Sequence, residues 1–224
     1  MTLANGSVTA PRILATLPTA EDESAYALCA GLVVDDSAAY VLMAVQPERS
    51  LYATTSLYRV ALDSGAVTAS KAKQLTDLCG YKKDQLLARR YDTSASSGSK
   101  HAELVSISTD TLEPTLLTTL DNDDLAAPAY DAEHDLIYLS SANQLVRLDA
   151  AFTPTLCARL AQRSYGNGES ALLRGGYLVA VYGEPLGYVR ASTDPYVIPD
   201  RTLTLAMRYT DEVTSAFMKE HPEI

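Results

Sequence analysis

Residues 136–160 read LIYLSSANQLVRLDAAFTPTLCARL, and this stretch consists of three short apolar segments separated by turn residues. Leu136 to Leu139 and Leu145 to Leu148 flank the turn at residues 140–143, and a third segment runs from Thr153 to Leu160. Ala129-Tyr-Asp131 precedes them through another polar turn. Short alternating segments bounded by turn chemistry indicate β-strands, so the unit is predicted to contain four strands.

The closing segment of this unit occurs in four copies along the chain. Its copies are Gly6–Leu17, Gly65–Leu75, Asp110–Leu120 and Ala150–Leu160. Strand-like segments that end in aspartate recur with them, and the four aspartates are spaced 47, 39 and 45 residues apart: Asp63, Asp110, Asp149 and Asp194. Strand-only repeats of about 40 to 50 residues are typical of propeller blades. The predicted fold class is therefore an all-β propeller with about four to five recognisable four-stranded blades.

The other units follow the same order of strands. One unit has segments at 32–35, 40–45 and 57–62, and another has them at 171–173, 177–182 and 188–191. A third is interrupted at residues 92–100, a Ser-rich insertion that predicts a long hairpin loop. Asp63, Asp110 and Asp149 are interpreted as turn formers, because aspartate accepts hydrogen bonds from backbone N–H groups two residues on.

Two readings of Gly6–Leu17 remain open. As an outer strand it would complete the last blade and close the ring, or the chain is one part of a larger ring. We favour the second reading, in which the propeller is incomplete.

Composition excludes several classes of function. The chain has 224 residues, 47% of them hydrophobic, and a net charge of -10, which disfavours nucleic acid or an anionic membrane surface as partner. It contains neither 18 consecutive apolar residues nor a signal-peptide pattern. Cys29, Cys79 and Cys157 form no CxxC motif, and we interpret them as buried small hydrophobes without a redox or metal role.

The pattern changes after Asp200. Leu203-Thr-Leu-Ala-Met207 predicts a strand, and Thr210 to Glu220 predicts a helix that Pro222 ends. The strand and the words Phe217-Met-Lys-Glu-His-Pro-Glu-Ile224 resemble the opening of family 1 extracellular solute-binding proteins, the lipid-anchored receptors of bacterial ABC importers. The resemblance implies that residues 201–224 begin an α/β domain, whereas residues 1–200 form the propeller or propeller fragment. An ordinary terminal helix that packs on the propeller is the alternative.

The repeated part resembles YVTN and PQQ-like propellers in its pattern of strands and turns, most closely at Leu51-Tyr52 and Leu57 to Asp63. It also departs from propeller families. The chain has no tryptophan, which WD40 and PQQ-docking repeats use, and it has only one Gly175-Gly176 pair, where kelch repeats carry one pair per blade.

The sequence predicts no catalytic residue, no metal ligand and no cofactor, and it leaves any ligand-binding residue unidentified. His101, His134 and His221 lie at a loop border, in a turn and at a helix end. A metal pair from His101 and His134 would require two loops to meet. The run Asp121-Asn-Asp-Asp124 lacks the glycine and the final glutamate of a calcium loop, Gly166-Asn-Gly168 has no phosphate-binding context, and no serine lies in a Gly-x-Ser-x-Gly motif.

The leading functional hypothesis is a non-catalytic extracytoplasmic propeller module of a bacterial solute-binding lipoprotein that binds a ligand or another protein. Its partners would be a small solute or carbohydrate, or transporter subunits. One alternative is a carbohydrate-active propeller enzyme, in which the arrangement of the blades would position a pair of carboxylates. The other is a structural scaffold for protein contacts.

Overall fold

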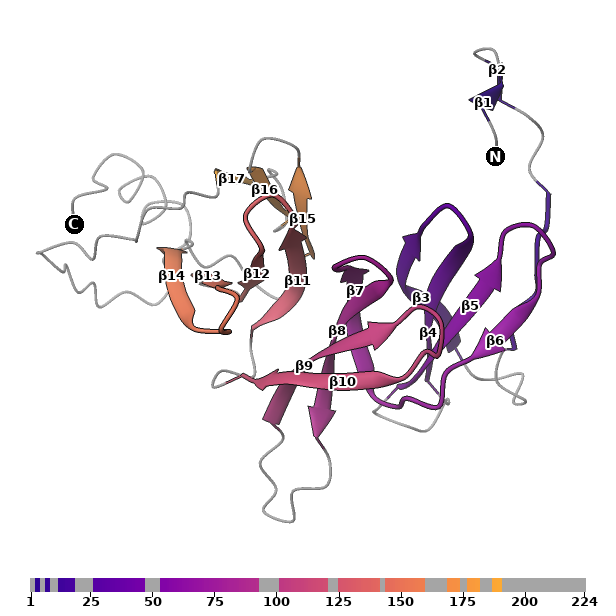
Figure 1. The fold of residues 1–224 in the computed structure, drawn as a ribbon, viewed down its shortest axis with the longest axis horizontal. Coiled ribbons are helices and arrows are strands. Elements are labelled where there is room, and N and C mark those ends of the chain that lie inside the picture. The colour runs from indigo at the N-terminus through magenta and orange to yellow at the C-terminus, as the bar shows by residue number, and fades with distance from the viewer. Residues whose placement is uncertain are drawn as a thin grey trace, which may run out of the picture.

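The computed structural model describes residues 3–4, 7–8, 12–18, 26–46, 53–92, 101–120, 125–141, 144–159, 169–173, 177–181 and 187–190. All regular structure in these ranges is β-strand, as Figure 1 shows. No helix long and apolar enough to cross a membrane occurs in this part of the chain. The predicted tail at residues 201–224 lies outside the described residues.

Three sheets contain four consecutive antiparallel strands each. We call them blade 1, blade 2 and blade 3. The strands of blade 1 are β3 (Tyr26–Val34), β4 (Ala38–Gln46), β5 (Thr54–Ala61) and β6 (Val67–Ala69). Those of blade 2 are β7 (Leu75–Gly80), β8 (Gln85–Asp92), β9 (His101–Ser108) and β10 (Pro114–Thr119). Those of blade 3 are β11 (Ala126–Asp131), β12 (Leu136–Ser140), β13 (Gln144–Leu148) and β14 (Pro154–Arg159).

A fourth sheet, blade 4, has three described strands. They are β15 (Glu169–Leu173), β16 (Tyr177–Val181) and β17 (Gly187–Arg190). The two-residue strands β1 (Leu3–Ala4) and β2 (Ser7–Val8) pair only with each other.

The first strands of the four blades contact one another in series: β3 contacts β7, β7 contacts β11, and β11 contacts β15. Each of the four sheets therefore presents its first strand to a common inner line, and blades 1 to 3 carry their fourth strand at the outer edge (Figure 1). This is the arrangement of a β-propeller, and it confirms the fold class predicted from the repeats. Pro114 and Pro154 begin β10 and β14, the outer edge strands, where the missing N–H costs no ladder hydrogen bond.

The hydrophobic core lies between neighbouring blades, because alternate residues of a strand point to opposite faces of a sheet. Along β8, Leu86 and Ala88 belong to the core shared with blade 1, whereas Leu87 belongs to the core shared with blade 3. In β9, Ile107 packs toward blade 1 and Leu104 toward blade 3. A blade is thus apolar on both faces.

The turns between the third and fourth strands of blades 1 to 3 share one backbone feature. Each ends in a residue with positive φ: Gly65 (72°), Leu112 (58°) and Phe152 (61°). A left-handed conformation costs a non-glycine residue about 1 to 2 kcal/mol. Leu112 is buried in the core between blades 1 and 2, and Phe152 packs against the core between blades 2 and 3. Burial of these side chains offsets the strain.

The prediction that Gly6–Leu17 forms an outer strand is wrong for the residues that the structure describes. Residues 12–18 form no strand, and Ser7–Val8 pairs with β1 and not with blade 4. The reason lies in the copied sequence itself: the matching stretch, residues 65–75, contains the short strand β6 followed by a connector at residues 70–74. Residues 12–17 correspond to that connector.

Truncation of Leu87 tests the inter-blade core. Leu87→Ala is expected to lower the free energy of unfolding by about 2 to 5 kcal/mol, because it leaves a cavity between blades 2 and 3. The measurement is urea denaturation followed by circular dichroism. Leu116→Ala is the matched control: Leu116 is 50% exposed on β10, and its truncation should cost less than about 0.5 kcal/mol. Equal losses in both variants would contradict this placement of the core.

Candidate functional site

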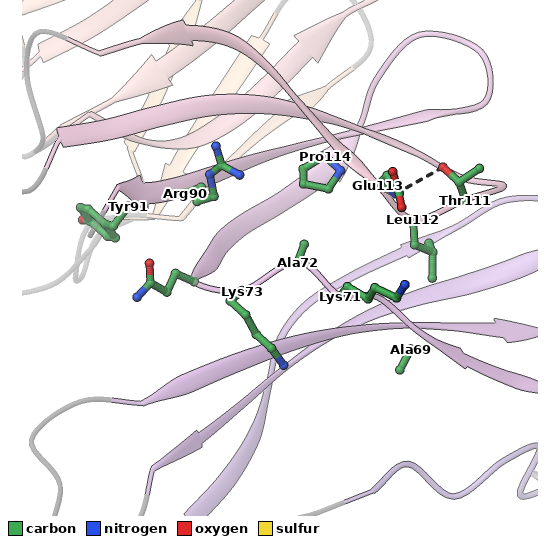
Figure 2. Close-up of a pocket in the computed structure, with 11 residues that line it drawn as sticks. Ala69, Lys71, Ala72, Lys73, Arg90, Tyr91, Thr111, Leu112, Glu113 and Pro114 are labelled. Atoms are coloured by element: carbon green, nitrogen blue, oxygen red, sulfur yellow. Dashed lines mark hydrogen bonds between the residues drawn. The ribbon is translucent and has the colours of Figure 1, made fainter. Parts of the chain in front are cut away.

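A groove of about 620 Å³ lies where blade 1 meets blade 2. Its walls come from the connector after β6, from the end of β8 and from the turn before β10, as Figure 2 shows. The lining residues are Ala69, Lys71, Ala72, Lys73, Gln74, Arg90, Tyr91, Thr111, Leu112, Glu113 and Pro114.

The connector positions two lysines because its middle residue is buried. Ser70 fixes its start: the Ser70 N–H donates to the carbonyl of Leu57 at 2.8 Å, and the Ser70 hydroxyl donates to the carbonyl of Leu112 at 2.7 Å. Ala72 packs into the core between the blades, and its N–H donates to the Ser70 hydroxyl at 3.0 Å. Lys71 and Lys73 on either side are exposed and line the groove (Figure 2).

Three cationic side chains and one carboxylate line this groove in a protein whose net charge is -10. Arg90 is held by Glu103 across β8 and β9, with Nη2 2.7 Å from Oε2. Among the described residues, the ammonium groups of Lys71 and Lys73 have no hydrogen-bond or ion-pair partner. The groove is therefore a local positive region with two lysines free to bind an anion.

A second polar cluster joins blades 2 and 3 at their first turns. Lys82 Nζ lies 3.0 Å from Asp135 Oδ1, and the ring of Tyr81 meets that of Tyr130 edge-on with centroids 4.7 Å apart. The Tyr130 hydroxyl donates to Asp135 at 3.0 Å. Hydrogen bonds from Lys82 and Tyr130 lower the pKa of Asp135. Since both members of the ion pair are about half exposed, water screens their attraction, and we interpret this cluster as an inter-blade contact.

The buried Arg89 makes a similar contact deeper in the same interface. Its Nε lies 2.9 Å from Asp77 Oδ2, Nη1 donates to the carbonyl of Leu125 at 2.8 Å, and its guanidinium lies 4.9 Å from the centre of the Tyr91 ring. These partners come from β7, from the segment before β11 and from β8. Arg89 thus ties blade 2 to blade 3 and is not available to a ligand.

The histidines considered from sequence do not come together. His134 Nδ1 lies 2.8 Å from Asp131 Oδ2 in the turn after β11, whereas His101 is exposed at the start of β9. No group of three or more potential metal ligands occurs among the described residues. His221, Asp121–Asp124 and Gly166–Gly168 lie outside the described residues.

The cysteines differ in environment. Burial raises the pKa of Cys79 to about 12 and raises that of Cys157, so both thiols stay protonated. The interpretation of these two as small hydrophobes fits their packing against the cores of blades 2 and 3. It is wrong for Cys29, which is exposed.

Of the three aspartates predicted to form turns, Asp149 is confirmed, because its Oδ1 accepts from the N–H groups of Ala151 and Thr153, each at 2.9 Å. At Asp110 the acceptor is instead the Ser108 hydroxyl oxygen, which accepts from the N–H groups of Asp110 and Thr111, each at 3.3 Å. Asp35 has the same role as Asp149 between β3 and β4, where Oδ1 accepts from the N–H groups of Ser37 and Ala38. These hydrogen bonds, led by that from Ser37, lower the pKa of Asp35.

Sequence analysis did not identify Lys71, Lys73 or Arg90. The alternation Lys71-Ala-Lys73 after a strand is the one local pattern that could have indicated two lysines on the same side. Nothing in the sequence placed these side chains beside Glu113, which lies 40 residues after Lys73 in the chain.

Comparisons with known proteins add a fold-level likeness. No protein-family model and no curated protein matches the sequence. Among solved structures, the chain is similar to the β-propeller domain of the Trilobed protease from Pyrococcus furiosus, described as having an open velcro topology. The identity is 7%, the TM-score is 0.44, and the match covers 69% of this chain and 48% of that one. The matched region thus spans about half the length of the other domain, and at this level of similarity it carries no argument about activity.

His134 provides a spectroscopic test of the turn after β11. The hydrogen bond to Asp131 raises the pKa of His134 above its ordinary value of 6.5. The stabilisation from this contact is therefore fully present below pH 6.5 and is lost as the pH rises through the raised pKa. Titration by NMR should give a His134 pKa above 6.5, and Asp131→Asn should lower it. An unchanged His134 titration in that variant would contradict the contact.

Proposed function

We propose that this chain is a non-catalytic propeller module that binds a small anionic solute in the groove between blades 1 and 2. The observation that supports this proposal is the pair of lysines, Lys71 and Lys73, which have no anionic partner among the described residues and flank one groove. The lysine ammonium group is a strongly hydrated point charge that suits carboxylate, sulfate or phosphate groups.

The dimensions of the groove favour a ligand the size of a disaccharide. A volume of about 620 Å³ lies within the range of about 300 to 1,000 Å³ that small-molecule sites occupy. Glu113 adds an acceptor for hydroxyl groups beside the lysines. An acidic saccharide carries both the carboxylate and the hydroxyls that this combination recognises.

The lining residues favour binding over catalysis. Glycoside hydrolysis commonly uses two carboxylates, and Glu113 is the single carboxylate among the residues that line the groove. The lining contains neither histidine nor cysteine. The lining residues therefore supply the groups that anion binding needs, whereas glycoside hydrolysis would need a second carboxylate beside Glu113.

The wider proposal is that the module belongs to an extracytoplasmic solute-binding lipoprotein of a bacterial importer. Its support is the sequence resemblance of residues 203–224, which lie outside the described residues. Fractionation of the native bacterium, with detection of the gene product by antibody, tests this context. Recovery in the cytosol would contradict it, whereas recovery with the membrane fraction is the expected result.

Binding of digalacturonate tests the groove. Lys71→Gln and Lys73→Gln are each expected to weaken binding by up to about fivefold, because a solvent-exposed ion pair contributes on the order of 0.2 to 1 kcal/mol. The measurement is isothermal titration calorimetry, and higher salt should weaken binding to the wild type. Lys83→Gln is the matched control, since Lys83 is exposed in the turn after β7, away from the groove.

The neutral disaccharide galactobiose separates charge recognition from general sugar binding. It should bind more weakly than digalacturonate, and its affinity should not change in the lysine variants. Equal affinity for both sugars, or equal weakening by Lys83→Gln, would contradict an anion site at Lys71 and Lys73.

A further inference from the structure

Every described contact between neighbouring four-stranded blades joins two defined faces. We call the face turned toward the preceding blade the front and the face turned toward the following blade the back. The back of blade 1 presents Tyr40, Leu42 and Leu57 to the front of blade 2. The front residues of blade 2 in this contact are Leu86, Ala88, Val105 and Ile107.

The contact between blades 2 and 3 repeats this arrangement at equivalent positions. The back of blade 2 presents Leu87 and Leu104. The front residues of blade 3 are Ile137, Leu139, Val146 and Leu148. Front and back faces are therefore complementary surfaces that the repeat produces in each blade.

Blade 1 has a front face of the same kind. In β4, Ala38, Tyr40 and Leu42 point to blade 2, so Ala39 and Val41 between them point to the front. In β3, Leu32 pairs with Val41 and Val34 pairs with Ala39, which places both on that front face. Leu32 is 59% exposed and Val34 is 57% exposed. The front face of blade 1 thus has the apolar pattern of an inter-blade surface, although it is exposed to solvent.

Residues 12–18 lie beside one turn of blade 1. A Cβ atom at Gly65 would overlap the carbonyl oxygen of Leu14, so glycine leaves the room that this close approach needs. At the equivalent position of blade 2, the carbonyl of Leu112 accepts from Ser70 of the preceding connector. Residues 12–18 therefore lie against the Gly65 turn of blade 1. The connector at residues 70–74 lies against the Leu112 turn of blade 2 in a similar way. Ile13 in this segment is 89% exposed.

The other described blades of the same chain do not cover this face. Blade 4 packs on blade 3 through β15 and β11, and Figure 1 places it at the opposite end of the series from β3. Blades 1 and 4 are thus the two ends of the described series of blade contacts.

We propose that the front face of blade 1 docks blade 4 of a second copy of this chain, head to tail. The contact continues the front-to-back rule that joins the described blades. A head-to-tail contact closes into a ring when its rotation allows. Each copy has four blade sheets among its described residues, and two copies would supply the eight that lie at the upper end of the usual range of about four to eight blades. This proposal is independent of the anion groove, which lies between blades 1 and 2.

The test is sedimentation velocity of the full 224-residue chain from about 1 to about 100 µM, the range in which moderate affinities become visible. The expected species has twice the 24.1 kDa mass of one chain. The double variant Leu32→Glu, Val34→Glu should associate at least about 100-fold more weakly, because docking would bury two unpaired carboxylates. Since both side chains are exposed in one chain, the variant should keep the wild-type circular dichroism spectrum; if it does not, Leu32→Ser is the milder replacement.

Leu116→Glu is the matched control, because Leu116 is 50% exposed on the outer strand β10 and should not affect association. A monomeric wild type throughout the concentration range would overturn the proposal. Association that survives the double variant would also overturn it.

Mixing distinguishes head-to-tail from front-to-front contact. Fluorescently labelled double variant keeps an intact blade 4, so it should still bind unlabelled wild type through one contact. A front-to-front dimer requires both front faces, and failure of the labelled variant to bind would overturn the head-to-tail arrangement.

Discussion

The fold depends on one property of its strands: successive side chains point to opposite faces of the sheet, and the side chains on both faces are apolar. Leu86 and Leu87 are neighbours in β8, yet they belong to the cores on opposite sides of blade 2. A sheet that is apolar on both faces must be covered on both, and a neighbouring sheet of the same kind provides that cover. Face-to-face stacking of blades is the consequence, and each added blade presents a new apolar face to the next.

Polar contacts fix how the blades meet. Ser70 donates across the interface to Leu112, Lys82 pairs with Asp135, and Arg89 bonds to Leu125. Such contacts contribute less free energy than apolar burial, but they have direction and therefore set the rotation of one blade on the next. The candidate site follows from this geometry: the connector that bonds to the turn of blade 2 also carries Lys71 and Lys73 to the mouth of the groove.

Much of the architecture could be predicted because it is encoded locally and repeated. The strands at 136–140 and 144–148 lie within a residue or two of the predicted segments, and Asp149 forms its turn as expected. The prediction failed at residues 12–17, because a connector that follows a short strand has the same apolar spacing as a longer strand. The prediction that Cys29 is buried also failed, because the sequence of β3 is that of an apolar strand whether or not another sheet covers it.

The sequence by itself determined that the repeated part of the chain is all-β and that its unit is a four-stranded repeat, and it contains no evident catalytic motif. These properties depend on periodicity and turn residues, which act over a few positions. Only the tertiary structure decided which faces are covered and which side chains share a groove. Lys71 and Glu113 are separated by a whole blade in sequence, and their approach depends on how blade 1 stacks on blade 2, through contacts between residues far apart in the chain.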